Sequence, residues 1–313
     1  MQNAMAEERA KNARAVFLIF LALFSVIYIK QVSQAVFRAL EICVRIVIPS
    51  LFPFAVLADL LVYAVDFTNA KKRDCVFLRR LLGIPVIGLL PFFLGALCGF
   101  PIGIKTAAEL YRRNLLTQKE FSQTVCFVNN TSPAFVIGSV GIGMLSSAKV
   151  GVLLYVIQIV SALLCGFLFA RIRHVPPMCG ITMTESVADG SLVAAIRRSA
   201  LSCLWITGSI CTFSALLSLI AILIKNTTVC LFISSFLEVG TACAAGSAFF
   251  TTRPPIALLV LCIAICFGGA SVHLQSAAFL PESKPLFRYY LGAKLCQAAI
   301  SVVLLLLVFP VLT

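Results

Sequence analysis

Long apolar stretches alternate with short polar or basic loops along most of this chain. Near Arg38, Glu41 and Arg45, charged and apolar positions alternate instead, so residues 31–47 predict an amphipathic helix lying in the membrane interface. The uninterrupted apolar stretches approach or exceed the ~20 residues with which a helix crosses a bilayer, and each predicts a transmembrane helix. They cover residues 15–29, 48–65, 150–170, 200–224 and 289–312.

Two further apolar stretches, 121–145 and 255–280, are each interrupted by polar, glycine or proline residues. The first break is Asn129–Pro133 and the second is Gly268–His273. Backbone groups there lose their intrahelical partners, which costs roughly 2 to 7 kcal/mol per unsatisfied amide in hydrocarbon. Such breaks persist where they line a cavity or bind a ligand. A pair of them in two halves of a chain is typical of secondary transporters.

Two other segments predict helical hairpins that enter the membrane and return to the same side. Residues 85–110 are apolar but are interrupted at Gly99–Pro101. The shorter segment 229–250 contains Glu238 among apolar neighbours. In both halves the expected order is therefore interfacial helix, span, hairpin, broken span and span.

The two halves align weakly, with Arg38 meeting Arg198 at an offset of 160 residues and Asn129 meeting Gly268 at an offset of 139. Each half is expected to cross the membrane three times, an odd number, so the second would be inverted. We expect an all-α integral membrane protein with about seven crossings, two re-entrant hairpins and two discontinuous helices. The expected parts are an extra N-terminal transmembrane helix (1–30), a first repeat (31–170), a cytoplasmic linker (171–190) and a second, inverted repeat (191–313).

Composition agrees with a multi-pass membrane protein, because 61% of the residues are hydrophobic, 12% are charged and the mean hydropathy is +1.05. The net charge of +13 does not indicate a nucleic-acid partner, since the basic residues lie in short loops beside apolar spans. The positive-inside rule then places the N-terminus in the cytoplasm and the C-terminus outside. The thirteen cysteines lie mostly within apolar runs and are interpreted as small buried residues.

Opposed half-helix N-termini offer free N–H donors and positive dipole ends, which suit a small anionic or strongly polar molecule. No nucleophile–base pair or metal-ligand cluster stands out, so an enzyme and a bound metal are not expected. The candidate substrate-binding residues are Gly99, Phe100, Pro101, Lys105, Asn129, Asn130, Thr131, Ser132, Glu238, Gly240, Thr241, Gly268, Gly269, Ser271, His273 and Gln275.

Several of these residues have a second interpretation. Asn, Ser and Gly also pack membrane helices together. Glu238 is either a proton or cation site, a partner of Lys105 or Lys294, or a residue at a wet hairpin mouth. His273 is either a proton shuttle or a hydrogen-bonding strut. Lys105 balances an anionic ligand or is a positive-inside charge, and Asp59 has an ordinary interfacial interpretation.

Four motifs carry a resemblance to a known family: Gly-Phe-Pro-x-Gly-x-Lys from Gly99, Ala-Glu-Leu-Tyr from Ala108, Asn-Asn-Thr-Ser-Pro-Ala-Phe from Asn129, and Phe-Gly-Gly-x-Ser-Val-His-x-Gln from Phe267. From about residue 33 onward the chain resembles the sporulation integral membrane proteins of the YlbJ (SpoVV) type, within the nucleoside-recognition "gate" domain superfamily. The second hairpin departs from that family, because an apolar residue follows Glu238.

The resemblance implies a fold akin to concentrative nucleoside transporters and movement of dipicolinic acid toward the forespore, in the bacterial cell membrane or the outer forespore membrane. Three functions stay open: a dipicolinic acid transporter working by alternating access, a proton- or sodium-coupled nucleoside transporter, and a non-transporting assembly protein of sporulation. The expected partners are the lipid bilayer and a small anionic substrate, with no cofactor beyond a coupling proton or sodium ion. A homo-oligomer is also left open.

Overall fold

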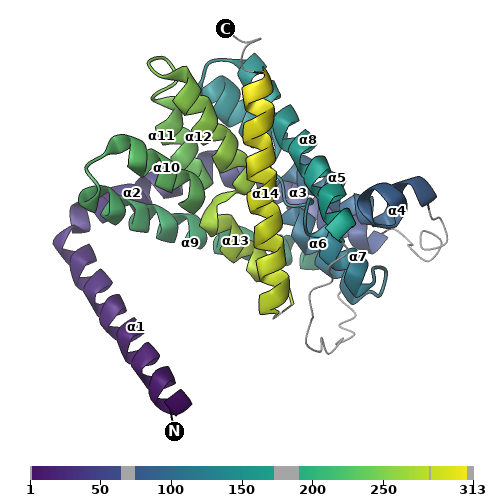
Figure 1. Ribbon diagram of the computed structural model, residues 1–313, viewed down its shortest axis with the longest axis horizontal. Helices are drawn as coiled ribbons and strands as arrows, with labels where there is room; N and C mark the ends of the chain where they lie inside the picture. The colour runs from purple at the N-terminus through teal and green to yellow at the C-terminus, as the bar shows by residue number, and fades with distance from the viewer. Residues whose placement is uncertain (1, 65–74, 173–189, 282, 309–313) are drawn as a thin grey trace.

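The computed structural model describes residues 2–64, 75–172, 190–281 and 283–308, and all regular structure in these ranges is helical. Elements of the first half of the chain lie mostly on the right in Figure 1 and those of the second half mostly on the left. The predicted all-α architecture is confirmed for these residues. The basic loop residues Lys71, Lys72 and Arg73, and most of the predicted linker 171–190, lie outside the described residues.

The N-terminal helix α1 (Gln2–Ile27) projects away from the body of the molecule (Figure 1). Its apolar side chains from Val16 to Ile27 are largely exposed, among them Phe17 and Leu23. A helix that is apolar around its whole circumference needs an apolar environment, which lipid supplies.

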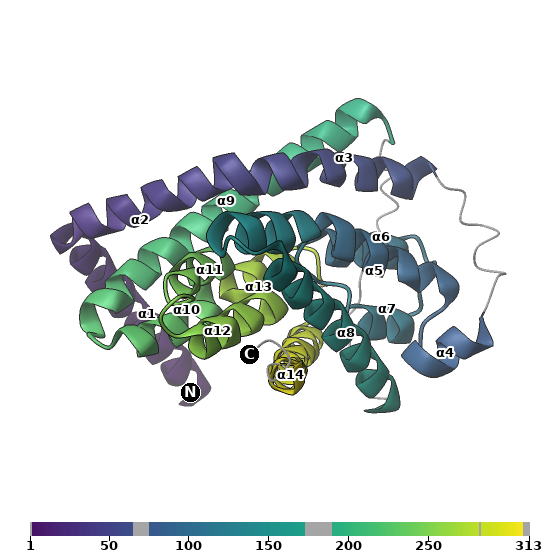
Figure 2. The same cartoon turned by 90° about the horizontal axis from the view of Figure 1, so that it is seen from above.

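Helices α2 (Ile29–Ile42), η1 (Cys43–Val47) and α3 (Ile48–Ala64) form one continuous helix along the top of Figure 2. The prediction of a separate interfacial helix ending at residue 47 was wrong. Wider π-helical turns carry the hydrogen bonding through the junction, with Ile48 N donating to Cys43 O. The charges that suggested an interface include an exposed pair within the helix, Arg45 to Glu41, at 3.2 Å.

Helix α9 (Leu192–Leu223) packs across this long helix (Figure 2). It begins eight residues before the predicted span at 200, and the side chain of its N-cap residue, Ser191, accepts a hydrogen bond from Ala194 N. Near the start of α9, Arg198 contacts Asp59 near the end of the long helix. Further along α9, Ile206 and Ile210 share a cavity with Leu51, which comes earlier in the long helix. The two long helices are therefore antiparallel where they meet.

The first half continues with a hairpin whose turn was predicted at Gly99–Pro101. Helices α4 (Val76–Leu82) and η3 (Val86–Gly88) lead into α5 (Leu89–Cys98), and α6 (Ile102–Arg112) returns, which confirms the turn. A Cβ atom at either Gly95 or Gly103 would lie 2.0 Å from the carbonyl oxygen of Val128. The two helices of the hairpin therefore pack at these glycines directly against the backbone just before the first break.

The first break is confirmed, because α7 (Gln118–Thr124) and η4 (Ala134–Met144) are separated by nine residues without a continuous helix. Helix α7 begins with a capping box, in which Thr117 Oγ1 accepts from Glu120 N and Glu120 Oε2 accepts from Thr117 N. Helix η4 is π-helical over its whole length, and α8 (Ala148–Ile172) follows.

The second half repeats this order. Helices α10 (Thr227–Leu237) and α11 (Val239–Ser247) form the predicted hairpin, and its turn lies at Glu238. Helices α12 (Pro254–Phe267) and α13 (Gly269–Ala277) are separated at Gly268, with positive φ angles of 94° there and 78° at Gly269. Glycine adopts such angles without the steric cost of a side chain. The second break is thus confirmed, and α14 (Lys284–Val308) ends the order.

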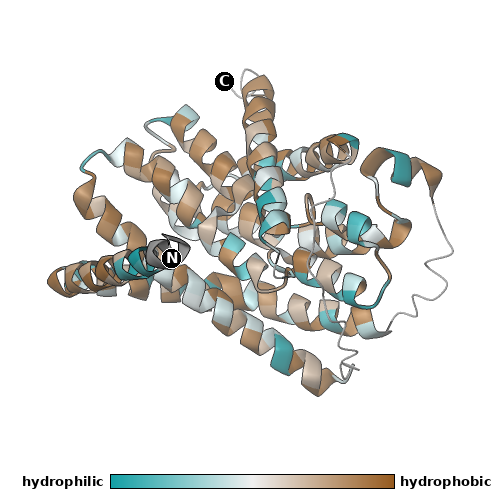
Figure 3. Ribbon diagram, turned by 60° about the horizontal axis from the view of Figure 1, so that its bottom comes forward, coloured by the Kyte–Doolittle hydropathy of each residue, from teal (hydrophilic) through white to brown (hydrophobic). Residues whose placement is uncertain are grey.

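Five helices in the described part of the chain are long and apolar enough to cross a membrane, and a sixth span results if the bent pair 76–82 and 86–98 counts as one. The five are 29–63, 148–172, 192–223, 254–277 and 284–308. Brown, hydrophobic residues predominate along the helices in Figure 3. The predicted crossings at 15–29 and 121–145 are not among these candidates, so seven crossings remain a prediction.

Helices α8 and α14 pack against each other in the centre of the molecule. Phe169 stacks edge-on to Tyr289 near one end, Cys165 Sγ donates to Ala293 O, and Gln297 Nε2 donates to Gln158 O further along. The residue numbers fall along α8 as they rise along α14, so these two helices are also antiparallel.

Candidate functional site

The two hairpin tips and the two helix breaks meet around a cavity of about 70 Å³, here named the central cavity. At this volume the cavity has room for a few water molecules at most. The lining residues include Gly99, Phe100, Thr131, Ser132, Glu238, Ser271 and Gln275, seven of the predicted substrate-binding residues. Ser50 and Leu51 of the long helix, with Ile206 and Ile210 of α9, line it from the other side.

Glycines allow the four parts to approach one another closely. A Cβ at Gly99 would lie 3.1 Å from Ser132 N, so the first hairpin tip abuts the first break. A Cβ at Gly269 would lie 3.0 Å from the backbone of Leu237, so the second break abuts the second hairpin tip. Gly268 faces the ring of Phe100, which joins the second break to the first hairpin tip. Pro101 follows in the first turn, as the N-cap residue of α6.

Ser271 is the lining residue that most directly indicates a ligand. Its hydroxyl group is fully buried and has no hydrogen-bond partner among the described residues. A buried hydroxyl group left without a partner costs roughly 1 to 3 kcal/mol, a cost that a polar ligand or a water molecule in the cavity removes. Gln275, one turn further along α13, also lines the cavity and adds an amide group.

Glu238 is buried and forms the N-cap of α11. Its carboxylate accepts hydrogen bonds from Gly240 N and Thr241 N, so it complements the positive end of that helix. The expected partnership with Lys105 or Lys294 is not what the structure shows. Lys105 pairs with Asp59, and Lys294 donates to Asn129 O and Gln297 Oε1.

Asn129 and Asn130 lie behind the central cavity in a buried polar network. Asn129 Nδ2 donates to Ser276 Oγ at 2.9 Å and to Tyr290 OH at 2.8 Å. Asn130 Nδ2 donates to Phe127 O, and its Oδ1 accepts from Gln297 Nε2. The side chains of the first break therefore bind to α13 and α14. The sequence analysis had predicted that they bind a ligand.

Gln158 of α8 and Thr131 extend this network toward the cavity. The amide group of Gln158 accepts from Thr131 N at 3.2 Å and donates to Thr131 O at 2.9 Å, which replaces the helical partners lost at the break. Thr131 Oγ1 donates to Ile265 O of α12. His273 Nδ1 lies 3.0 Å from Tyr290 OH, which fits the strut interpretation of His273, while its Nε2 has no partner among the described residues.

Sequence reasoning missed most of the second-half side chains in this network. Tyr290, Lys294 and Gln297 are fully buried and follow one face of α14 at spacings of four and three residues. Lysine and glutamine within an apolar helix are a strong sign of a functional or structural contact in a membrane. Lys294 had been considered only as a partner for Glu238.

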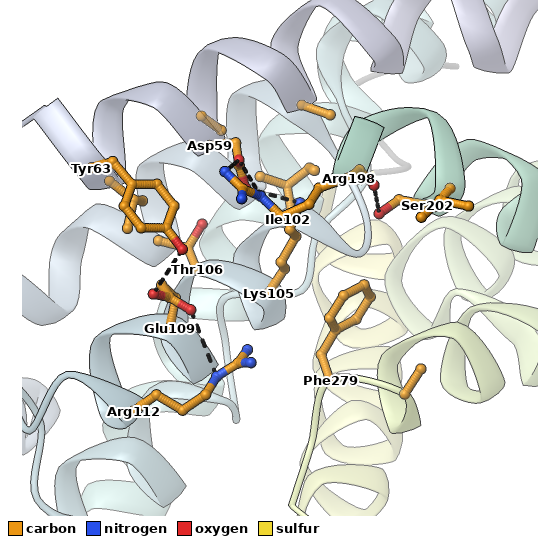
Figure 4. Close-up of a pocket in the computed structure, with 15 residues that line it drawn as sticks. Asp59, Tyr63, Ile102, Lys105, Thr106, Glu109, Arg112, Arg198, Ser202 and Phe279 are labelled. Atoms are coloured by element: carbon orange, nitrogen blue, oxygen red, sulfur yellow. Dashed lines mark hydrogen bonds and ion pairs between the residues drawn. The ribbon is translucent and has the colours of Figure 1, made fainter. Parts of the chain in front are cut away.

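A second cavity of about 410 Å³, the charged vestibule, opens next to the central cavity (Figure 4). Asp59 accepts from Arg198 Nη2 at 2.6 Å and from Arg198 Nε at 2.8 Å, and it lies 3.2 Å from Lys105 Nζ. Glu109 accepts from Arg113 Nε at 2.9 Å and from Tyr63 OH at 3.2 Å. The predicted site residue Lys105 thus belongs to this vestibule, together with Asp59, which the sequence analysis had treated as an ordinary interfacial charge.

A third cavity of about 460 Å³, the small-residue vestibule, lies beyond the other end of the central cavity. Alanine and serine residues from α2, α9 and α11 line much of it. The predicted site residue Thr241 lies here, and its hydroxyl group is hydrogen-bonded to that of Ser214 at 3.2 Å.

The three cavities follow the same two antiparallel helices. Along the continuous helix, Arg38 lines the small-residue vestibule, Leu51 the central cavity and Asp59 the charged vestibule. Along α9, Leu217, Ile206 and Arg198 line them in the same order. The cavities are therefore arranged in line, with the hairpin tips and breaks at the middle one.

Among proteins of known sequence, the chain is 29% identical over 142 residues to the sporulation integral membrane protein YlbJ of Bacillus subtilis (strain 168). The match covers 45% of this chain and 34% of the relative, so it is shorter than the resemblance expected from residue 33 onward. No family model and no solved structure matches the chain. The chain is therefore similar to a sporulation integral membrane protein over less than half of either sequence.

Proposed function

We propose that this chain, a relative of the sporulation integral membrane protein YlbJ, is a secondary transporter that moves a small anionic metabolite by alternating access. The observation that carries the proposal is the line of three cavities, with a small central cavity between two hairpin tips and two helix breaks. A polar solute entering either vestibule would reach the same central cavity. The proposal is for a transporter rather than an enzyme.

An inverted repeat supports alternating access, because each half then supplies the opening to one side. Helices α8 and α14 end the two halves and run antiparallel, as corresponding helices of an inverted repeat must. The continuous helix α2–α3 corresponds to α9, and this pair is antiparallel too. We infer that the halves 31–170 and 191–313 form such a repeat, with seven crossings once α1 and the first broken helix are included.

Under the positive-inside rule, the basic residues Lys105, Arg112 and Arg198 around the charged vestibule support a cytoplasmic position for it. The N-terminus would then be cytoplasmic as well. In a spore-forming cell the protein would lie in the cell membrane or the outer forespore membrane, which is the location implied by the resemblance.

Dipicolinic acid is the substrate that the resemblance implies. The central cavity supplies hydroxyl and amide groups from Ser132, Ser271 and Gln275 to receive its carboxylates. Glu238 is the one charged residue among the described residues that line this cavity, and its negative charge would repel a dianion. The proposal therefore requires a coupling proton or sodium ion that neutralises Glu238 when the substrate enters.

A nucleoside is the second candidate substrate, and the same lining favours it. A carboxylate with hydroxyl and amide neighbours, and without a cationic side chain among the described lining residues, suits a neutral ligand rich in hydroxyl groups. Uptake by the purified protein in liposomes, measured with radiolabelled dipicolinate and with radiolabelled uridine, separates the two candidates. Uptake of neither by the wild-type protein would contradict transport and favour a non-transporting assembly protein.

Ser271→Ala tests the site directly. We expect about a tenfold loss of uptake, the size of one hydrogen bond of ~1.4 kcal/mol to the ligand, with little change in thermal stability. Ser122→Ala is the matched control, because Ser122 is a buried serine of α7 that likewise has no side-chain partner among the described residues. Equal uptake by the two variants would remove Ser271 from the site. Asn129→Ala and Asn130→Ala should abolish uptake, but they also disturb the polar network.

A further inference from the structure

We propose that Lys105 and Arg198 in the charged vestibule form a recognition site for the carboxylate groups of a small organic anion, which competes with Asp59 and thereby opens the path to the central cavity. The proposal rests on the proposed transport function and adds to it a peripheral ligand site and a gate. Its basis is the position of one carboxylate between three helices.

Asp59 of α3 is the contact that joins the three helices. Its Oδ2 accepts hydrogen bonds from two nitrogen atoms of Arg198 of α9, Nε and Nη2, while Oδ1 faces Lys105 Nζ of α6 at 3.2 Å. A guanidinium group binds best when its two N–H groups meet two separate oxygen atoms. Because Asp59 offers Arg198 a single oxygen, a free carboxylate that offers two would form the stronger pair.

Lys105 also has unused capacity for hydrogen bonding. Its Nζ is buried, and within the described chain it has no hydrogen-bond partner of suitable geometry, although it is ion-paired with Asp59. An ammonium group carries three donors. A second carboxylate in the vestibule would supply acceptors to this nitrogen, so a dicarboxylate fits better than a monocarboxylate.

The charge balance of the vestibule favours an anion on this inner side. Glu109 is already paired with Arg113 at 2.9 Å and lies 3.6 Å from Arg112, so the outer carboxylate is balanced by outer arginines. Asp59, by contrast, is ion-paired with both Lys105 and Arg198. The cavity of about 410 Å³ is also large enough to hold a small aromatic acid.

The same three helices close the path between the charged vestibule and the central cavity. Buried Ala55 of α3, Ile102 of α6 and Ile206 of α9 belong to one apolar cluster at this level. Asp59 lies one turn from Ala55, and Lys105 lies one turn from Ile102. Releasing Asp59 from its two partners would therefore free all three sides of the constriction to separate.

Cys98 provides a native reporter, because it is buried and lines the central cavity. The full-length protein in liposomes or detergent is treated with a water-soluble maleimide, and labelling of each cysteine is quantified by mass spectrometry. Exposed Cys75 serves as the positive control, and Cys165, buried between α8 and α14, serves as the negative control. Dipicolinate is compared with its uncharged diamide at equal ionic strength.

We expect dipicolinate to raise the labelling rate of Cys98 in the wild-type protein by about tenfold, and the diamide to leave it unchanged. Asp59→Asn should raise the rate without ligand. Lys105→Gln and Arg198→Gln should show no further response to dipicolinate. Glu41→Gln, which removes an exposed pair on the same long helix, should behave like the wild type.

The proposal is overturned if dipicolinate leaves the labelling of wild-type Cys98 unchanged, a measurement that depends on no variant. A response that survives in both Lys105→Gln and Arg198→Gln, or a parallel rise at Cys165, also overturns it. Uptake into liposomes is scored separately. Uptake without a change in Cys98 labelling would support the transport function and contradict the gate. A change in Cys98 labelling without uptake would support the ligand site and contradict transport.

Discussion

The two vestibules lie at opposite ends of the same pair of long helices but are closed by different chemistry. In the charged vestibule, Asp59 joins α3 to α6 and α9 through Lys105 and Arg198. In the small-residue vestibule, α9 meets α11 through the neutral hydroxyl pair of Ser214 and Thr241. Similar helical frameworks can therefore present an ion-paired closure at one end and a weak polar closure at the other.

In the alignment of the proposed repeats, this difference corresponds to two positions. At the offset of 160, Arg198 corresponds to Arg38, so an arginine is present at both ends. At the offset of 139, Lys105 corresponds to Ala244, and at the offset of 160 Asp59 corresponds to Leu219. The acid and the lysine that complete the ion-paired cluster thus occur in one half alone, and opening this end requires the separation of charges.

The largest effect is expected for Gly103→Ala, because the added Cβ would lie 2.0 Å from Val128 O, a backbone atom that cannot move independently. We expect loss of the folded protein, beyond the ~1 to 3 kcal/mol of ordinary overpacking. The yield of monodisperse protein in detergent is the measurement. Gly208→Ala is the control, since a Cβ there meets no atom within 4 Å. Similar yields for the two variants would contradict the close packing of Gly103 against Val128.

Asp59→Ala should come next, with a loss of about 3 kcal/mol, because it leaves two cations without their carboxylate in a largely buried site. Thermal unfolding in detergent measures the loss. Glu41→Ala, which breaks the exposed pair with Arg45, should cost less than about 1 kcal/mol. If both variants unfold at the same temperature, the ion-paired closure contributes no more than a surface pair.

Ser214→Ala probes the opposite closure and should cost only about 1 kcal/mol, the net value of one neutral hydrogen bond. The same thermal unfolding measurement applies. Thr212→Ala is the matched control, because its hydroxyl group bonds within α9 to Gly208 O. A loss of stability for Ser214→Ala as large as that for Asp59→Ala would contradict the difference between the hydroxyl pair at one end and the ion pairs at the other.

The smallest effect is expected from salt. Raising the ionic strength from about 0.01 M to 0.15 M shortens the screening length from ~30 Å to ~8 Å, so anion uptake through the charged vestibule should slow by a few-fold. Initial uptake rates at low dipicolinate concentration measure this change. Reversing the orientation of the protein in the liposome should weaken the salt dependence, because the small-residue vestibule then faces the substrate.

Sequence reasoning located the backbone features well. The breaks at Asn129–Pro133 and Gly268 and the turn at Gly99–Pro101 follow from local chemistry, since proline, glycine and polar residues interrupt an apolar helix wherever it lies. Continuity of α2–α3 was missed because Arg38, Glu41 and Arg45 also fit an interfacial helix. Such charges are compatible with either arrangement when the neighbouring helices are unknown.

Side-chain partners were much harder to predict. Asp59 meets Arg198 across 139 residues of sequence, and Lys294 meets Asn129 across 165. No local pattern encodes such pairs, because the packing of helices from the two halves creates them. The available signal was weaker and more general: a lysine, a glutamine or an aspartate within an apolar stretch needs a partner.

The polar network behind the central cavity limits which parts of the molecule can move in the proposed transport cycle. Six of the hydrogen bonds that join the first break and α8 to the second half involve Asn129, Asn130, Thr131 and Gln158. At ~1 to 1.5 kcal/mol each, separating the halves there would cost roughly 6 to 9 kcal/mol. Fewer than about one molecule in ten thousand would then be separated at equilibrium. Both breaks, α8 and α14 are thus expected to stay together as one rigid body, while the long helices and hairpins rearrange around them.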